Sequence, residues 1–226
     1  SPNSLWAVYG GYDIDYNPYT YIPSGLPQFG VSKLSKNGWL NIPYESLFGA
    51  KSISRVTINP KNEKQVYISS FHSGLLKIEN DIPIALFDNT NTGPNGLQEI
   101  TTSPGDIWIN GTAYDNTGNL WITNSVVAKG MKVLKTNGQF ASYDMTGVFS
   151  NLGRLRMGRL VIDKNGTKWM ATWRDGIIGF NEAYNNRFKV ISGTTDGRGQ
   201  VMPLSTETQA LLRFLEQETG LTFEVQ

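Results

Sequence analysis

Residues 115–123 read DNTGNLWIT, and residues 163–172 read DKNGTKWMAT. In both copies a glycine follows the aspartate by three positions, and a tryptophan follows it by six. The two tryptophans, Trp121 and Trp169, are 48 residues apart. Repeats of roughly 40–50 residues are typical of four-stranded propeller blades. This pair therefore predicts an all-β protein that is built from repeated small sheets.

Two weaker copies extend the pattern towards the N-terminus. Residues 58–69 read INPKNEKQVYIS, with a longer turn and with Tyr67 in place of the tryptophan, and residues 5–9 read LWAVY. We expect a β-propeller or partial propeller over residues 1–200, with about four recognisable blades that form part of a larger propeller protein. Regular short strands also fit a β-sandwich, which is the alternative fold.

Each repeat predicts a meander of three or four strands. A short strand leads into an Asp/Asn and Gly turn, in which the glycine is free to take a positive φ. The next strand carries the Trp or Tyr, and a second glycine (Gly74, Gly130 or Gly176) precedes the third strand. Outer strands are predicted at 139–143 and 187–191. Such small sheets must stack face to face, because one alone buries too little apolar surface.

Two stretches depart from the repeat. Residues 10–30 are rich in Tyr, Pro and Gly and predict a long loop between strands. Residues 201–226 form an off-pattern tail, in which 205–219 predict a helix because Thr206 and Gln209 fit a capping box and leucines line one side.

Composition excludes several classes of protein. The 226 residues contain no cysteine, which excludes a disulfide framework and thiolate metal sites. The net charge is +1 and no basic stripe is present, so we expect no nucleic-acid partner. No apolar run approaches the ~20 residues of a transmembrane segment. The chain starts at Ser1 instead of Met, and we expect a mature segment or a piece of a longer protein.

The sequence offers little to support catalysis. His72 is the only histidine, and since no Gly-x-Ser-x-Gly elbow accompanies it, we expect a surface histidine in a turn. Asp115 and Asp163 are expected to bond their own turn backbones. The segments 13–15 and 163–166 are too short to supply a full set of calcium ligands, so a calcium ion is possible only with ligands from several loops and is not indicated. We predict no enzyme activity, no catalytic residue, no metal site and no cofactor.

Aromatic and arginine side chains are the candidates for ligand binding. Exposed rings can stack on sugars or form a protein interface, where Tyr, Trp and Arg are enriched. Arginine suits phosphate or carboxylate groups, although a charged loop that only faces solvent is the alternative for the cluster at 154–159. The candidate ligand-binding residues are Trp108, Trp173, Tyr12, Tyr16, Arg154, Arg156 and Arg159.

The motifs also carry a family resemblance. The frames at 115–123 and 163–172 resemble the two-component regulator propeller repeat of Bacteroidetes, which occurs in periplasmic sensors of hybrid two-component systems and in surface proteins. The segments LWAVYGGY (5–12), YNPY (16–19), GWLNI (38–42) and INPKN (58–62) resemble PorZ-type proteins of the type IX secretion system.

The resemblance to the PorZ type implies a role at the cell surface and outer membrane. That family assists the attachment of secreted cargo and helps to deliver anionic lipopolysaccharide to a sortase, so a PorZ-like role implies lipopolysaccharide binding and protein partners in a surface attachment complex. The regulator repeat implies an alternative, a periplasmic sensor that binds a polysaccharide. A glycan-active enzyme is the second alternative.

Overall fold

The computed structural model describes residues 4–10, 28–148, 156–172, 176–184 and 187–191. The predicted helix at 205–219 and most of the predicted loop at 10–30 lie outside these ranges. The described residues form fifteen strands and two short 3-10 turns, at Tyr44–Ser46 and Glu182–Tyr184, with no α-helix among them. The all-β prediction is confirmed for this part of the chain.

The strands make four separate antiparallel sheets, which we call blades 1 to 4. Because these sheets are small and separate, the structure is not a sandwich of two larger sheets. Blade 1 contains β1 (Ser4–Val8), β2 (Val31–Ser35) and β3 (Gly38–Ile42); blade 2 contains β4 (Ile53–Asn59), β5 (Asn62–Ser70), β6 (Gly74–Glu79) and β7 (Ile82–Phe87); blade 3 contains β8 (Ile109–Tyr114), β9 (Leu120–Asn124), β10 (Met131–Leu134) and β11 (Phe140–Tyr143); blade 4 contains β12 (Met157–Ile162), β13 (Lys168–Thr172), β14 (Ile177–Asn181) and β15 (Arg187–Ile191).

Each blade is a meander, as the repeat predicts. Neighbouring strands in the chain are neighbours in the sheet, and the turns between the first and second strands of blades 3 and 4 contain Gly118 and Gly166 with φ of 98° and 80°. Glycine takes such positive φ values without the steric cost that a side chain adds. Asp115 Oδ1 accepts bonds from the backbone N–H groups of Gly118 and Asn119 at 2.8 and 2.9 Å. The predicted role of the turn aspartate is confirmed.

Trp121 and Trp169 occupy equivalent places in their blades. Trp121 pairs with Ala113 on β8 and Val133 on β10, and Trp169 pairs in the same way with β12 and β14. Tyr67 holds the same place in blade 2, between β4 and β6. The three rings are therefore related by the repeat, as the sequence pattern predicts.

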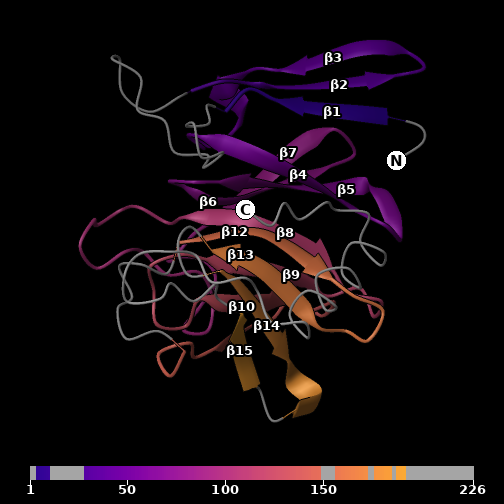
Figure 1. Cartoon of the computed structure of the whole chain (residues 1–226). Helices are drawn as coiled ribbons and strands as arrows, with labels where there is room; N and C mark the ends of the chain where they lie inside the picture. The colour runs from indigo at the N-terminus through magenta and orange to yellow at the C-terminus, as the bar shows by residue number, and fades with distance from the viewer. Residues whose placement is uncertain (1–3, 11–27, 149–155, 173–175, 185–186, 192–226) are drawn as a thin grey trace, which may run out of the picture.

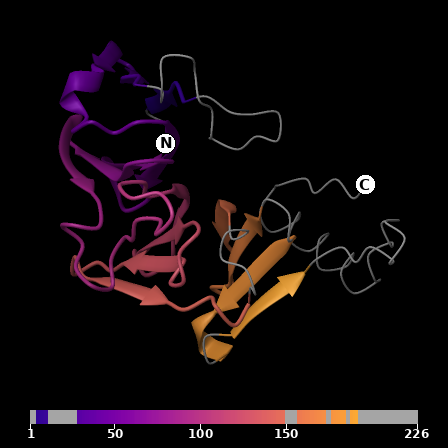
Figure 2. The same cartoon turned by 90° about the vertical axis from the view of Figure 1, so that its left-hand side faces the viewer.

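The blades stack face to face along an arc. Figure 2 shows them following one another from blade 1 to blade 4, and in Figure 1 the first strands β1, β4 and β8 lie one below the other, with β12 beside β8. One apolar cluster lies in each seam between neighbouring blades. The first strands therefore line the inner side of the arc, where side chains from several blades meet.

Candidate functional site: an axial cavity

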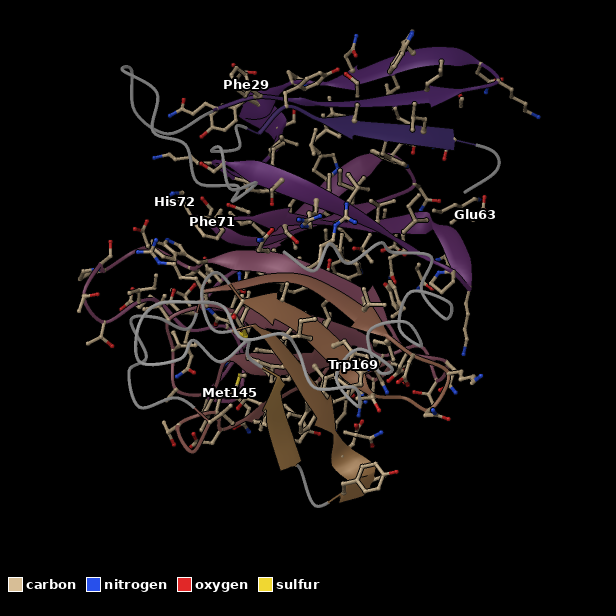
Figure 3. The ribbon with its side chains drawn as sticks, viewed as in Figure 1. Phe29, Glu63, Phe71, His72, Met145 and Trp169 are labelled. Carbon is tan, nitrogen blue, oxygen red and sulfur yellow. The ribbon has the colours of Figure 1, made fainter. Side chains whose placement is uncertain are left out.

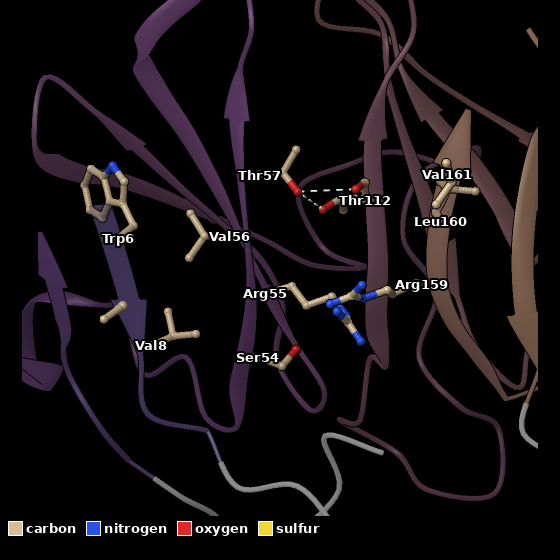
Figure 4. Close-up of a pocket in the computed structure, with 11 residues that line it drawn as sticks. Trp6, Val8, Ser54, Arg55, Val56, Thr57, Thr112, Arg159, Leu160 and Val161 are labelled. Carbon is tan, nitrogen blue, oxygen red and sulfur yellow. Dashed lines mark hydrogen bonds between the residues drawn. The ribbon is translucent and has the colours of Figure 1, made fainter. Parts of the chain in front are cut away.

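A cavity of about 620 Å³ lies against the first strands of the four blades (Figure 4). We call it the axial cavity. Trp6, Ala7 and Val8 of β1 line one side of it, and β12 lines the other. Its remaining lining residues come from β4, β8 and β12 and are Ser54, Arg55, Val56, Thr57, Thr112, Arg159, Leu160 and Val161.

Two arginines from different blades reach into this cavity. Figure 4 shows the side chains of Arg55 and Arg159 extending towards one another. Arg55 lies two residues before Thr57, which pairs with Tyr67, and Arg159 lies two residues before Val161, which pairs with Trp169. The two arginines therefore occupy equivalent places in their blades. The corresponding residue of blade 3 is Gly111, which has no side chain. The repeat thus places two guanidinium groups around one space.

Neighbouring polar groups orient this part of the cavity. Arg55 Nε donates a 3.0 Å hydrogen bond to Asn110 Oδ1, which holds the guanidinium against blade 3. The hydroxyls of Thr57 and Thr112 are 2.6 Å apart and bond to each other across the seam. Arg55 is half-buried, whereas Arg159 is exposed.

The charge of the axial cavity is positive. No Asp or Glu is among the described residues that line it. Guanidinium groups stay protonated and offer several N–H donors in a planar fork that matches carboxylate and phosphate oxygens. The arrangement is therefore suited to holding an anionic group.

The structure separates the arginines that the sequence places together. Arg159 lines the axial cavity, whereas the guanidinium of Arg156 lies over the ring of Trp108, 5.2 Å from the ring centroid. Trp108 is 9% exposed and stacks on Phe71 at 4.9 Å, so it is not the exposed ring that we expected. The other candidates, Arg154, Trp173, Tyr12 and Tyr16, lie outside the described residues.

The prediction for His72 is wrong in one respect. His72 is 3% exposed and lies beside Phe71 (Figure 3), so it is a buried residue and not a surface one. Its Nδ1 is 3.0 Å from Asp106 Oδ1. Burial lowers the pKa of His72, and this outweighs the opposing effect of Asp106. A short turn with Ser and Gly neighbours suggested exposure, but Trp108 and Phe71 cover the imidazole.

Sequence reasoning missed Arg55, although the repeat contains its signal. Residues 55–59 read RVTIN and residues 159–163 read RLVID, so each arginine precedes the turn Asn or Asp by four positions. Aligning these strands would have paired Arg55 with Arg159. The cluster at 154–159 drew attention instead because its arginines are close in the sequence.

The described residues contain no group of three or more His, Cys, Asp or Glu side chains that could hold a metal ion. In the same ranges, no helix has the length and apolarity needed to cross a membrane.

Comparison with known proteins gives a likeness of fold. No family model and no curated protein sequence matches the chain. Among solved structures, PorZ of Porphyromonas gingivalis superposes with a TM-score of 0.69 at 18% identity, over 89% of this chain and 28% of PorZ. That protein is described as an essential bacterial surface component of the type IX secretion system.

Two further structures share the arrangement less closely. The catalytically inactive histidine-to-alanine variant of virginiamycin B lyase from Staphylococcus aureus, solved with quinupristin, gives a TM-score of 0.54 at 15% identity, over 87% of this chain and 62% of the lyase. The extracellular domain assigned to a one-component system of Bacteroides thetaiotaomicron gives a TM-score of 0.51 at 15% identity, over 80% of this chain and 27% of that structure. The chain thus spans less than two thirds of each structure, and the shared property is the propeller-like fold.

Proposed function

We propose that this chain is a non-catalytic binding module that holds an anionic group of a bacterial surface polysaccharide in its axial cavity. The observation that carries the proposal is the pair Arg55 and Arg159, which line one cavity that no described carboxylate lines. Two guanidinium groups around one space favour a phosphate or carboxylate, since each can donate two parallel hydrogen bonds to such a group.

The proposed setting is the bacterial cell surface at the outer membrane. The likeness to PorZ supports this setting, since PorZ is a surface component of the type IX secretion system. In a PorZ-like role the ligand is anionic lipopolysaccharide, whose phosphate and carboxylate groups match the arginine pair. Protein partners of a surface attachment complex would then bind elsewhere on the blades.

A larger propeller is part of this proposal. The outer face of blade 1 carries Leu5 and Trp39, which are 61% and 59% exposed, and β3 is an unpaired edge within the described residues. In the other seams such faces are covered by a neighbouring blade. Exposed apolar surface of this kind fits a face that another blade covers in the whole protein.

Each of the two alternative functions, a sensor and an enzyme, is represented by one of the similar structures. The extracellular sensor-type domain supports a periplasmic module that binds a polysaccharide fragment as a signal. The lyase shows that an enzyme can share this arrangement of strands. We favour binding without turnover because the charged groups of the axial cavity are both arginines.

Retention on immobilised anionic lipopolysaccharide tests the proposal. The wild-type chain should be retained, and a neutral dextran surface should not retain it. Arg159→Ala should weaken retention by about tenfold, because it removes one charged pair of hydrogen bonds. Lys36→Ala is the matched control, since Lys36 is an exposed cation in the turn between β2 and β3.

Two results would contradict the proposal. One is equal retention of a folded Arg55→Ala/Arg159→Ala variant and of the wild type. The other is release of shortened or unsaturated glycan products during the incubation, which would favour the enzyme. A kinase-linked membrane segment in the flanking gene sequence would favour the sensor over the surface component.

A further inference from the structure

The seams between the blades are not filled in the same way. Between blades 3 and 4, Trp121 is 2% exposed and stacks on Tyr143 at 5.6 Å. The Lys168 ammonium lies over the Trp121 ring, 4.0 Å from the ring centroid. The indole Nε1 donates to Asp115, so the ring is fixed and the seam is filled.

The seam between blades 2 and 3 has a smaller ring and an amide at the equivalent positions. Tyr67 stands in the place of Trp121, and Asn59 stands in the place of Asp115. A cavity of about 350 Å³ lies here, which we call the seam cavity. It shares no lining residue with the axial cavity. Ligand pockets begin at about this volume.

The seam cavity contains oriented polar groups. Gln65 Oε1 accepts hydrogen bonds from Asn59 Nδ2 at 2.8 Å and from the Tyr114 hydroxyl at 3.2 Å, which fixes the plane of its amide. Within the described ranges, Gln65 Nε2 and the Tyr67 hydroxyl have no hydrogen-bond partner, and neither atom is fully buried. Both groups can therefore bond to a molecule that enters the cavity.

Aromatic rings and cations complete the lining. Tyr67 stacks on Phe87 with ring centroids 6.4 Å apart, so the cavity has an apolar wall. Lys77 and the exposed Lys135 also line it, and no Asp or Glu is among its described lining residues. Lys77 is paired with Glu79 at 3.2 Å, which leaves Lys135 as the better placed cation for a ligand.

We propose that the seam cavity binds one acidic sugar residue, a pyranose that carries a carboxylate. The apolar face of the sugar packs on the aromatic wall, the Gln65 amide and the Tyr67 hydroxyl bond its ring hydroxyls, and Lys135 binds the carboxylate. Planar amides and aromatic rings fit the alternating polar and apolar faces of a pyranose, and the cation selects for charge. This site is a second one, beyond the anion site of the proposed function.

Ligand-observed and protein-observed NMR with D-glucuronate tests the proposal, with D-glucose as the neutral probe. The wild-type chain should bind glucuronate at concentrations of up to about 20 mM, and glucose should bind about fivefold or more weakly. Lys135→Ala should weaken glucuronate binding by about fivefold, because it removes one charge-assisted bond. Lys36→Ala is the matched control on the surface.

A second variant fills the cavity instead of removing a charge. In the Arg55→Ala/Arg159→Ala background, Tyr67→Trp with Asn59→Asp introduces the Trp and Asp pair of the other seam and should abolish glucuronate binding. Binding by this folded variant at wild-type strength would overturn the proposal, as would equal binding of glucose or no glucuronate binding by the wild type. The Arg55→Ala/Arg159→Ala variant itself should still bind glucuronate in the seam cavity, which separates a failure here from a failure of the axial site.

Discussion

The indole Nε1 of Trp121 donates a 2.8 Å hydrogen bond to Asp115 Oδ2, six residues earlier in the chain. Blade 4 repeats this bond between Trp169 and Asp163 at 2.9 Å. The bond explains the spacing of the repeat: the aspartate closes its turn with one oxygen and holds the ring of the next strand with the other.

Removing this carboxylate should destabilise the protein. Asp115→Ala leaves the Trp121 indole N–H and the backbone N–H groups of Thr117 and Asn119 without their acceptor, and we expect a loss of about 1–3 kcal/mol in the free energy of unfolding. Urea unfolding followed by fluorescence measures it. Asp144→Ala is the control, because Asp144 is exposed and, among the residues that the structure describes, it accepts hydrogen bonds from Thr146 alone; an equal loss there would contradict the role given to the indole bond.

The Asp115 carboxylate also predicts that the stability of the fold depends on pH in the acid range. Burial alone would raise the pKa of Asp115, but hydrogen bonds from Thr117, Trp121 and Asn119 outweigh it and lower the pKa from 3.8 to about 2. The folded state therefore binds this proton less readily than the unfolded state. Its stabilising contribution is complete above about pH 4 and is lost as the pH falls through about 2. In the Asp115→Asn variant, the free energy of unfolding should change less with pH in this window than in the wild type. An unchanged slope would contradict the prediction.

Lys132 predicts that stability also depends on pH in the alkaline range, here because of burial. Its side chain is fully buried, and Nζ donates to Gln98 Oε1 at 2.8 Å. Burial, followed by repulsion from Lys129, lowers the pKa of Lys132 from 10.5 to about 7. Between these values the unfolded state binds more protons, so stability should rise with pH from about 7 towards 10.5.

A substitution separates this effect from the rest of the titration. Lys132→Met removes the cost of burying an ammonium group and should stabilise the protein by about 1–3 kcal/mol near pH 6. The rise of unfolding free energy above pH 7 should then be absent. Thermal unfolding of both proteins between pH 6 and 10 measures the difference, and parallel curves would rule out the depressed pKa.

Gly179 leaves room for the indole ring of Trp169 in blade 4. A Cβ atom at Gly179 would lie 2.8 Å from Cζ3 of Trp169, whose indole is held by Asp163. Gly179→Ala should therefore destabilise the protein by about 1–3 kcal/mol through overpacking. Gly147→Ala is the control, because no atom of the described part of the chain lies within 4 Å of its Cβ position. Equal melting temperatures of the two variants would contradict the packing.

Much of the fold could be predicted from local sequence. The turn glycines and the Trp or Tyr of the second strand recur at a fixed spacing, and the strands that they predict are all found within the described residues. The third strand begins at or just after Gly74, Gly130 and Gly176, as predicted. Local patterns are sufficient here because each blade is a meander of consecutive strands.

The sites were less predictable because they form between blades. Arg55 and Arg159 share a cavity although 104 positions separate them in the chain. Trp108 departs from the repeat, which suggested an exposed ring, but Phe71 of the preceding blade covers it. The spacing of a motif predicts a strand, whereas the exposure of a side chain depends on which neighbour packs against it.

A double-mutant cycle on Arg55 and Arg159 tests the central claim most directly. The dissociation constant of anionic lipopolysaccharide is measured for the wild type, Arg55→Gln, Arg159→Gln and the double variant, with folding checked by circular dichroism. If both guanidinium groups hold one anion, each single variant should lose most of the affinity, with a coupling energy of about 1 kcal/mol or more. Losses that simply add, or unchanged affinity in the folded double variant, would contradict a shared anion site in the axial cavity.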